Sequence, residues 1–279
     1  VIDQNPAAWC AIELAILDLL GRENMQIIEE VLKLPQLSGE FQYTAVIGTK
    51  HMVTFYLQAL LYKLKGFNTF KLKIFGKEKE DRKKIRFLEL LSQEGKTRID
   101  ANNLWASSEK ALDYLKKLNY SFSGVEEPIT ANQYQALSEI SQKLNTPIIL
   151  DESFLRLSQF QEIAKYSARW IINVRVSKMG GLIRSLKVCE EARRRKIPVI
   201  IGAQVGETSI LTRAALTLAN TFRDILIAQE GAFGTYLLEK DIAEPSIRFG
   251  KRGILKTNKL TEGKQYGLGL LVKTPHGIS

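Results

Sequence analysis

The sequence predicts an α/β protein, a TIM-like modified (β/α)8 barrel with a C-terminal extension, from three observations. Short apolar runs that are typical of buried strands alternate with amphipathic helical patterns along most of the 279 residues. Eight such runs occur, whereas an open doubly wound sheet usually has fewer strands and needs a switch point. Acidic residues also recur where consecutive runs stop, and in a parallel barrel those stops lie on the face that carries the active site.

The first predicted element is a helix over residues 5–22, which has a continuous apolar stripe. The chain starts with Val1 rather than Met, and no earlier element is available to bury this stripe. We therefore expect a further N-terminal segment to precede the first residue.

Strands and helices then alternate. The strand patterns cover residues 42–48, 69–75, 97–102, 122–128, 147–152, 170–178, 197–204 and 224–230. The helical patterns cover residues 51–66, 78–94, 108–118, 133–144, 157–165, 180–196 and 208–220. Gly66 closes the first of these helices, and Gly180 and Gly181 stand at the entrance of the sixth. The tail after residue 230 is rich in Gly, Lys and turn residues, which indicates an extension that packs outside the barrel.

Composition and charge exclude several classes of partner. The net charge is +10, but much of the excess lies on predicted helices where both signs mix, without interleaved aromatic residues, so we expect no nucleic-acid partner. No apolar run approaches the roughly 20 residues that span a bilayer, so we expect no membrane partner. Cys10 and Cys189 are too few for a disulfide framework, which favours a reducing cytoplasm.

The chemistry of the chain is predicted from five residues at strand ends. Asp100, Glu126 and Asp151 end three successive strands at spacings of one βα unit, and Lys71 and Lys73 end the strand before them. A single acid after a strand is usually a cap or a turn residue, but three in register suit a hard cation such as Mg²⁺. Lys71 and Lys73 point to the same side of their strand, and their like charges favour a lysine base. Taken alone, this pair also fits an edge strand with solvated lysines.

These residues resemble the enolase superfamily, specifically the muconate lactonizing enzyme-like subgroup of its mandelate racemase/muconate lactonizing enzyme family. The matching segments are KLK (71–73), DANNLW (100–105), VEEP (125–128), LDES (150–153), INVRVSKMGG (172–181) and GAQVGETS (202–209). The resemblance implies the end of a capping-domain or linker helix region over 1–40, a catalytic barrel over 41–230 and the C-terminal extension over 231–279. It also implies a homo-oligomer, because members are commonly oligomers.

The resemblance implies a role for each site residue. Asp100, Glu126 and Asp151 would bind Mg²⁺ or Mn²⁺, which holds a small carboxylate substrate and stabilises the enediolate formed when the α-proton leaves. Lys73 would be the base, with Lys71 tuning its pKa. Two further groups, Asn102 and Glu152, would orient the site.

The sequence departs from the family pattern on the sixth strand. Members usually carry a second catalytic lysine there, and this position is Arg175, while Lys178 matches a later lysine beside the glycines. Asn173 and Arg175 share one side of this strand by its period of two. Because arginine stays protonated, Arg175 is a poor base, although it can stabilise anionic charge or stack on a substrate π-system. Two-base racemisation is therefore disfavoured.

Other residue patterns narrow the function further. The histidine base of the mandelate racemase-like branch is absent, since the chain has only His51 and His276. The Asp-x-Asp of dipeptide epimerases is also absent from the eighth strand, which ends ILIAQE. Glu207, after the seventh strand, either lines the pocket or caps the next helix with its charge.

The sequence favours a Mg²⁺-dependent lyase or isomerase that removes a proton α to a carboxylate. Because only one base is evident, dehydration of the o-succinylbenzoate synthase type or a cycloisomerisation is preferred. Three alternatives stay open: a racemase or epimerase of the same superfamily, a Schiff-base aldolase-type barrel using Lys73 or Lys178, and a non-catalytic homologue.

Overall fold

The computed structural model describes residues 1–92, 97–233, 237–261, 263 and 265–273. The chain forms two compact units. The first unit comprises Val1–Tyr43, Val174–Gly250 and Ile254–Ser279, and the second comprises Thr44–Asn173 and Lys251–Gly253. The predicted helix end at 94 and His276 lie outside the described residues.

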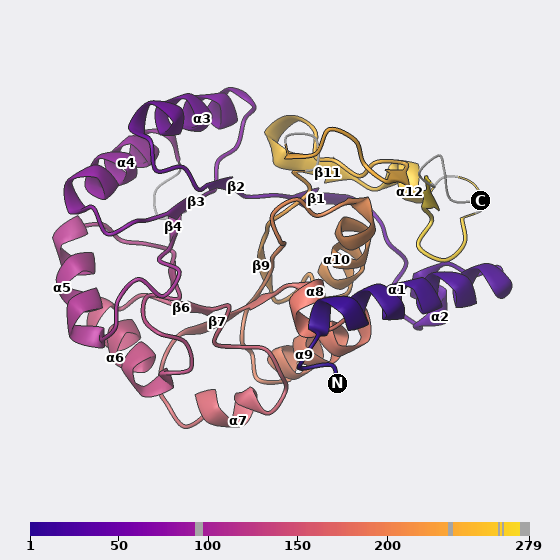
Figure 1. Ribbon diagram of the computed structural model, residues 1–279, viewed down its shortest axis with the longest axis horizontal. Coiled ribbons are helices and arrows are strands. Elements are labelled where there is room, and N and C mark those ends of the chain that lie inside the picture. The colour runs from indigo at the N-terminus through magenta and orange to yellow at the C-terminus, as the bar shows by residue number, and fades with distance from the viewer. Residues whose placement is uncertain (93–96, 234–236, 262, 264, 274–279) are drawn as a thin grey trace. The chain divides into compact units, whose positions relative to one another are not determined.

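The second unit is a run of parallel strands, each connected to the next by a helix (Figure 1). Its strands pair in sequence order and are β2 (Ala45–Ile47), β3 (Phe70–Lys73), β4 (Thr97–Asp100), β5 (Gly124–Glu126), β6 (Ile148–Leu150) and β7 (Trp170–Val174), the last of which ends at the unit boundary. The helices lie outside the strands and are α3 (Met52–Leu64), α4 (Glu78–Leu91), α5 (Ser108–Leu118), α6 (Tyr134–Leu144) and α7 (Gln159–Ile163), followed late in the chain by the 3₁₀ turn η1 (Lys251–Gly253).

Local sequence explains where these helices begin and end. Ser107 caps α5 by accepting a hydrogen bond from the backbone N–H of Lys110. Helices α5 and α6 both end at an asparagine in the left-handed conformation, Asn119 and Asn145, which is a residue type that tolerates positive φ. Each of these turns returns the chain to the start of the next strand, so the strand ends recur at similar heights.

The register of the strands fixes which side chains share a face. Lys73 lies opposite Asp100, and Asp100 lies opposite Glu126. The residues between them alternate to the other face and are fully buried, namely Leu72, Ile99 and Val125. One face of the sheet is therefore an apolar layer, and the other carries the charged residues.

The first unit contains the N-terminal helices, the last two strands of the series and the C-terminal segments. Its helices are α1 (Pro6–Glu23), α2 (Ile28–Val31), α8 (Val176–Met179), α9 (Leu182–Arg194), α10 (Ser209–Thr221) and α12 (Asn258–Thr261). Its strands are β1 (Glu40–Gln42), β8 (Val199–Ile201), β9 (Leu226–Gln229), β10 (Ala243–Glu244), β11 (Ile254–Lys256) and β12 (Leu271–Val272). β8 and β9 are parallel, whereas β1 pairs with β11, and β10 with β12, in antiparallel fashion.

Helix α1 packs against α8 and α9 through two glycines. A Cβ at Gly181, whose φ is +122°, would meet the carboxylate of Glu13 at 2.3 Å. That carboxylate accepts a hydrogen bond from the backbone N–H of Ile183 at 3.0 Å, so Glu13 satisfies a donor in the first turn of α9. Only glycine allows this close approach, which explains the glycine pair at the entrance of the helix.

Eight parallel strands, β2 to β9, follow one another in sequence order, which is the connectivity of a (β/α)8 barrel. The predicted strands are longer than the observed ones, and two differ in kind: the pattern over 42–48 contains the end of β1 and all of β2, which pair in different sheets, and the pattern over 170–178 includes a helix. The pattern over 170–178 ends as a strand at Val174, because residues 176–179 form the one-turn helix α8, which Gly180 terminates with φ +83°.

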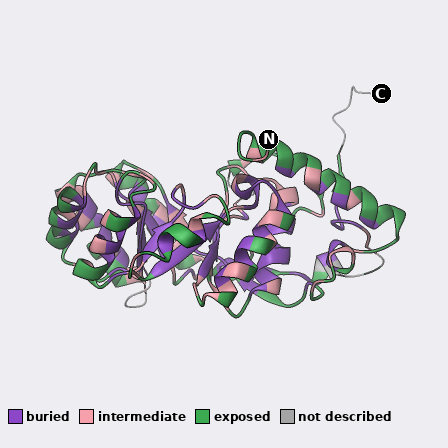
Figure 2. Ribbon diagram, turned by 90° about the horizontal axis from the view of Figure 1, so that it is seen from below, coloured by how far each residue is buried: buried purple, intermediate pink, exposed green. Residues whose placement is uncertain are grey.

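Figure 2 shows buried residues concentrated in the strands, and exposed residues on the outward faces of helices. None of the described helices is long and apolar enough to cross a membrane.

Candidate functional site

The buried end of the second unit holds a cluster of charged side chains around Lys71. Its ammonium lies 2.8 Å from the carboxylate of Glu126 and 3.5 Å from that of Asp100. The side-chain amide of Asn173 donates a hydrogen bond of 3.1 Å to the same Glu126 carboxylate. Glu126 is 1% exposed and Lys71 5%, so these charges interact away from bulk water. The structure thus brings together four of the predicted site residues.

Asp151 occupies the same face one step further along. Glu126 lies opposite Ile149 in the ladder, and Asp151 follows Ile149 by two residues, so period-two alternation places both acids on one face. Asp151 is buried. The three predicted carboxylates therefore stand at the ends of neighbouring strands.

Glu127 organises the backbone around these acids. Its carboxylate accepts hydrogen bonds from the backbone N–H groups of Asp151 (2.6 Å) and Ser153 (2.7 Å), from the Ser153 hydroxyl (2.7 Å) and from the Asn103 amide (3.3 Å). Its own backbone is held at φ +39°, an uncommon conformation that stores strain. Burial raises the pKa of the Glu127 carboxyl, against hydrogen bonds from Ser153 and Asp151 that lower it. Glu127 thus joins the ends of β4, β5 and β6.

Asn102 and Glu152 take different positions at the edge of the cluster. Asn102 is exposed, and its backbone N–H donates a hydrogen bond of 3.0 Å to the Asp100 carboxylate. Glu152 is half-buried, and its negative charge acts on Glu127. Asn102 thus contacts a predicted metal ligand through its backbone.

Lys73 lines a cavity of about 430 Å³ within the second unit. The strand register places Lys73 beside Asp100, and Ala101 and Asn102 continue the cavity wall from the end of β4. The remaining wall comes from the loops after β2, β3 and β4 and from the start of α4, with Lys50, Ile74, Phe75, Lys77, Glu80 and Leu104. Three lysines and an aromatic ring around one cavity suit a substrate that carries negative charge. Sequence reasoning missed Lys50, Phe75 and Lys77, although each lies at or just after the end of a predicted strand.

The carboxylates fit a hard cation by their donor chemistry, since oxygen ligands are what Mg²⁺ prefers. Among the residues that the structure describes, however, no group of three His, Cys, Asp or Glu side chains is spaced as a ready metal site. Two of the three predicted ligands are instead drawn to the Lys71 ammonium. The cluster thus holds a cation already, in the form of a lysine side chain.

The predicted residues of the first unit form a second group. The Arg175 guanidinium donates a hydrogen bond of 3.2 Å to the Gln204 side chain, and the Gln204 backbone N–H donates one of 2.6 Å to Glu207. Burial raises the pKa of Glu207 to about 7, although the Gln204 N–H and the Arg175 charge both favour the ionised form. Lys178 lies beyond the strand, half-buried on α8, as its position in the motif predicts.

The side-chain hydrogen bonds at the start of the helix after Glu207 come from Asp241, and the predicted capping of this helix by the Glu207 charge stays a prediction. The backbone N–H of Ser209, in the first turn of α10, donates to the Asp241 carboxylate at 3.1 Å, and the Ser209 hydroxyl donates to the same group at 2.6 Å. Asp241 is therefore the capping residue, and Glu207 is held by the loop before the helix. No local pattern could indicate a cap that comes from 32 residues further along the chain.

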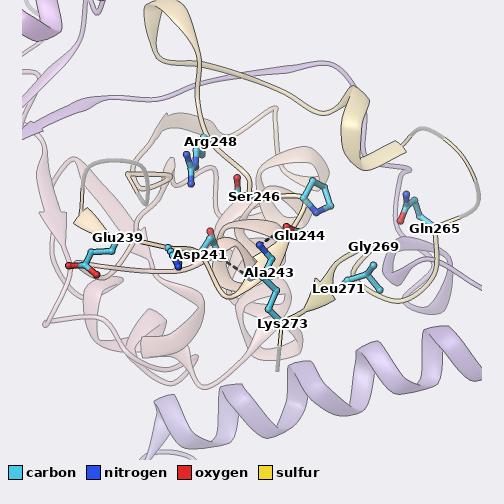
Figure 3. A pocket seen from close by; sticks show the side chains of 12 residues that line it. Glu239, Asp241, Ala243, Glu244, Ser246, Arg248, Gln265, Gly269, Leu271 and Lys273 are labelled. Carbon is cyan, nitrogen blue, oxygen red and sulfur yellow. Dashed lines mark hydrogen bonds and ion pairs between the residues drawn. The ribbon is translucent and has the colours of Figure 1, made fainter. Parts of the chain in front are cut away.

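A larger cavity, of about 590 Å³, lies among the C-terminal segments of the first unit (Figure 3). Its charged walls are partly engaged within the protein, since Lys273 pairs with Glu244, and Asp241 accepts the backbone N–H of Ala243 at 3.1 Å. None of the predicted site residues lines it. We therefore assign the candidate site to the smaller cavity, because that cavity adjoins the carboxylate cluster.

Comparison with known families agrees with this arrangement. Residues 56–270 match the sequence profile of the family described as enolase C-terminal domain-like. The chain belongs to this family. The match covers every predicted ligand and lysine of the site, so it confirms the enolase-superfamily resemblance.

Curated relatives of this enolase family member include racemases and epimerases. N-succinyl-L-Arg/Lys racemase of Bacillus cereus is 26% identical over 254 residues, which are 88% of this chain and 68% of the racemase. The hydrophobic dipeptide epimerase of Enterococcus faecalis is 27% identical over 270 residues, which are 95% of this chain and 73% of the epimerase. These relatives favour the isomerase alternative over the dehydration that the sequence alone prefers.

Solved structures of the family share the fold. The dipeptide epimerase from Cytophaga hutchinsonii, complexed with Mg and the dipeptide D-Ala-L-Val, superposes with a TM-score of 0.82 at 23% identity, covering 98% of this chain and 72% of the epimerase. This likeness confirms the predicted TIM-like barrel class.

Proposed function

We propose that this chain carries the catalytic barrel of a Mg²⁺-dependent racemase or epimerase that acts on a small carboxylate of the N-acylated amino acid type. The observation that carries the proposal is the position of Lys73, which is in register with Asp100 and Glu126 and lines the cavity beside them. A base beside Asp100, on the face that carries the other two carboxylates, matches the removal of a proton α to a carboxylate. The substrate class is taken from the names of the curated relatives.

Each residue of the second unit then has a chemical role. Asp100, Glu126 and Asp151 would hold Mg²⁺, or Mn²⁺, which supplies positive charge that stabilises the developing negative charge of the substrate. The α C–H bond breaks, the proton goes to Nζ of Lys73, and the electron pair moves into the carboxylate. Lys71 and Asn173 fix the Glu126 carboxylate through the contacts of 2.8 and 3.1 Å. Lys50 and Lys77 attract the anionic substrate to the cavity.

Arg175 favours a second candidate function, a one-base reaction such as the dehydration of a hydroxy acid. A racemase must deliver a proton to the face opposite the first base, and arginine does not exchange protons readily near neutral pH. Its side chain is held by Gln204 beside Glu207, which suits a fixed positive charge. In this second candidate, Lys73 alone removes the proton and Arg175 stabilises anionic charge.

Proton exchange in D₂O tests the proposal. The chain is incubated with Mg²⁺ and N-succinyl or N-acetyl amino acids of each hand, and the α-proton signal is followed by NMR together with chiral chromatography. We expect exchange that falls by about 10²–10⁴-fold in Lys73→Met, because the base is removed. Lys83→Met, which alters an exposed lysine of the same unit, is the control and keeps full activity.

The outcomes distinguish the two candidates. Exchange with formation of both enantiomers supports the racemase, and exchange with retained configuration supports one-base chemistry. Exchange that persists in Lys73→Met, or in EDTA, contradicts both. Borohydride trapping of a substrate adduct would instead support the Schiff-base barrel.

Metal binding is tested separately by calorimetry. Asp151→Asn is expected to abolish saturable Mg²⁺ binding, because one of three charged oxygen ligands is lost. Asp113→Asn, which alters an exposed acid that pairs with Lys117, is the matched control. Equal Mg²⁺ affinity in Asp151→Asn and the wild-type chain would rule out this ligand set.

A further inference from the structure

Helix α4 carries a lysine on its buried face. Lys84 is 1% exposed, and it shares this face with Asp81, Ile85 and Leu88. A helix position that faces the interior is normally apolar, because removing an ammonium group from water is costly. Burial accordingly lowers the pKa of Lys84, although the charge of the nearby Asp81 carboxylate opposes this shift. The contacts of the ammonium group show what this buried charge holds in place.

The Lys84 ammonium binds the loop that connects β2 to α3, which spans residues 48–51. It donates hydrogen bonds to the backbone carbonyls of Thr49 (3.0 Å) and Lys50 (3.3 Å). The loop begins at Gly48, where an added Cβ would meet no atom within 4 Å, so this end of the loop is not packed tightly. Hydrogen bonds from a charged donor are roughly twice as strong as those between neutral groups. Lys84 therefore fixes the backbone of this loop against α4.

The same ammonium lies beside the aromatic ring that the Lys50 side chain contacts. Nζ of Lys84 is 5.2 Å from the centroid of the Phe75 ring, and Nζ of Lys50 is 5.3 Å from the same centroid. Both distances are within the range of a cation–π contact. Lys84 thus acts on Lys50 in two ways, through the Lys50 carbonyl and through the ring against which the Lys50 side chain lies.

Lys50 lines the candidate cavity together with Lys73, Lys77 and Glu80. Lys77 pairs with Glu80 at 3.2 Å, so the Lys77 charge is partly compensated, and Lys73 is the proposed base. In the part of the chain that the structure describes, the Lys50 ammonium contacts the Phe75 ring rather than a carboxylate. Lys50 is therefore the lysine of this cavity that is best placed to bind a second negative charge on the substrate.

We infer that Lys84 is a positioning residue, which sets Lys50 at the cavity so that the site prefers a substrate with a second carboxylate, distant from the one that reacts. This inference rests on the proposed function, because it concerns the acyl end of the same N-acylated amino acid. Without Lys84 the loop over 48–51 loses both carbonyl contacts, and the Lys50 ammonium is no longer fixed. Lys84 thus acts on substrate binding and not on proton removal.

Binding of two matched ligands in the presence of Mg²⁺ tests this preference by calorimetry. N-succinyl-L-alanine carries the second carboxylate, and N-butanoyl-L-alanine carries a methyl group in its place. We expect the wild-type chain to bind the succinyl compound more tightly, and the ratio of the two dissociation constants to fall about 5–10-fold in Lys84→Met and in Lys50→Met. The double variant should show no further fall, because Lys84 acts through Lys50. Lys84→Arg should keep most of the preference, because a guanidinium retains donors for both carbonyls.

Hydrogen exchange over residues 48–55 tests the contact between Lys84 and the loop without any ligand. We expect the backbone N–H groups of this segment to exchange about 10-fold faster in Lys84→Met, relative to the rest of the second unit. Lys83→Met, at the exposed neighbouring position, is the control for the loss of charge. Leu137→Ala, at a fully buried residue of α6, is the control for a general loss of stability. Both controls should leave the ligand preference and the relative exchange of the segment unchanged.

The two measurements together decide the inference. A preference that is lost in Lys50→Met but kept in Lys84→Met overturns it, as does a wild-type chain without any preference between the two ligands. Unchanged exchange over 48–55 in Lys84→Met overturns it as well. If neither ligand binds while this segment exchanges faster in Lys84→Met, the positioning role of Lys84 is supported, and the proposed substrate class is contradicted.

Discussion

Two buried ionic regions of the molecule differ in how completely their charges are matched. In the first unit Arg213 pairs with Glu29 through two hydrogen bonds of 2.8 and 2.7 Å. Arg213 also donates to the Thr217 hydroxyl at 2.8 Å and to the Leu268 carbonyl at 3.0 Å, and the Thr217 hydroxyl donates to Glu29. One cation meets one anion with the fork geometry that arginine and carboxylate share. This pair ties α2, α10 and a C-terminal segment together.

The charges of the cluster around Lys71 in the second unit are paired differently. Its ammonium faces two carboxylates, Glu126 and Asp100, with Asp151 on the same face and a cavity beside them. Three acids share this face with two lysines, Lys71 and Lys73, and the Lys71 ammonium contacts two carboxylates rather than forming a one-to-one pair. The comparison teaches that a one-to-one buried ion pair indicates structure, whereas acids and lysines that share contacts beside a cavity indicate a candidate site.

The largest effect is expected at the structural pair. Arg213→Met leaves the Glu29 carboxylate buried without its partner, so the free energy of unfolding should fall by about 3–5 kcal/mol. Urea denaturation measures this change. The double variant Glu29→Leu with Arg213→Met should recover most of the loss, because an apolar pair replaces the ionic one.

The double variant also sharpens the comparison. If it is no more stable than Arg213→Met alone, then the pair stabilises by more than charge compensation, and the contrast with the Lys71 cluster is wrong. Mg²⁺ binding by the second unit should be unaffected in either variant, which separates the two regions.

A smaller effect is expected at Glu127, which positions the cluster without belonging to it. Glu127→Gln replaces an acceptor oxygen with an N–H₂ group that faces donors on Asp151 and Ser153, so stability should fall by about 2–3 kcal/mol. Mg²⁺ affinity should fall by about 10–100-fold, because the backbone of a ligand residue is released. Calorimetry and urea denaturation measure the two effects. An unchanged affinity despite the loss of stability would show that Glu127 only supports the fold.

The sequence predicted the second unit well because its signals are local. The apolar runs that became β3 to β6 end at charged residues, and one βα unit separates each acid from the next, so the strand ends and the candidate site residues were predicted together. The strand predicted over 170–178 was too long, because Val176 continues the alternation while the glycines after Met179 favour a helical turn. Strands of two residues, such as β10 and β12, are too short to show an alternation of apolar and polar residues in the sequence.

Contacts between distant segments could not be predicted in the same way. Asn103, Glu127 and Ser153 come from three successive strand ends, and nothing in their spacing distinguishes them from ordinary turn residues. The same holds for Lys50 and Phe75, which enter the cavity from loops whose path depends on tertiary packing. The residue types led to the predicted chemistry, while the three-dimensional fold was needed to show which neighbours surround the candidate site.

The smallest effect on stability is expected at Glu207, whose negative charge is only partly compensated by Arg175. Its pKa is about 7 in the folded chain and 4.5 in the unfolded chain, because burial opposes ionisation despite Arg175. Below pH 4.5 both states hold the proton, and between 4.5 and 7 the unfolded state releases it first. The free energy of unfolding therefore falls as pH rises through this window, and Glu207→Gln removes that fall.

The free energy of unfolding of the variant, relative to that of the wild type, should therefore increase by about 1–2 kcal/mol between about pH 5 and pH 8. Urea denaturation at both pH values measures this gain. If the difference in the free energy of unfolding between variant and wild type does not change with pH, then the Arg175 charge compensates the Glu207 charge as fully as Arg213 compensates Glu29.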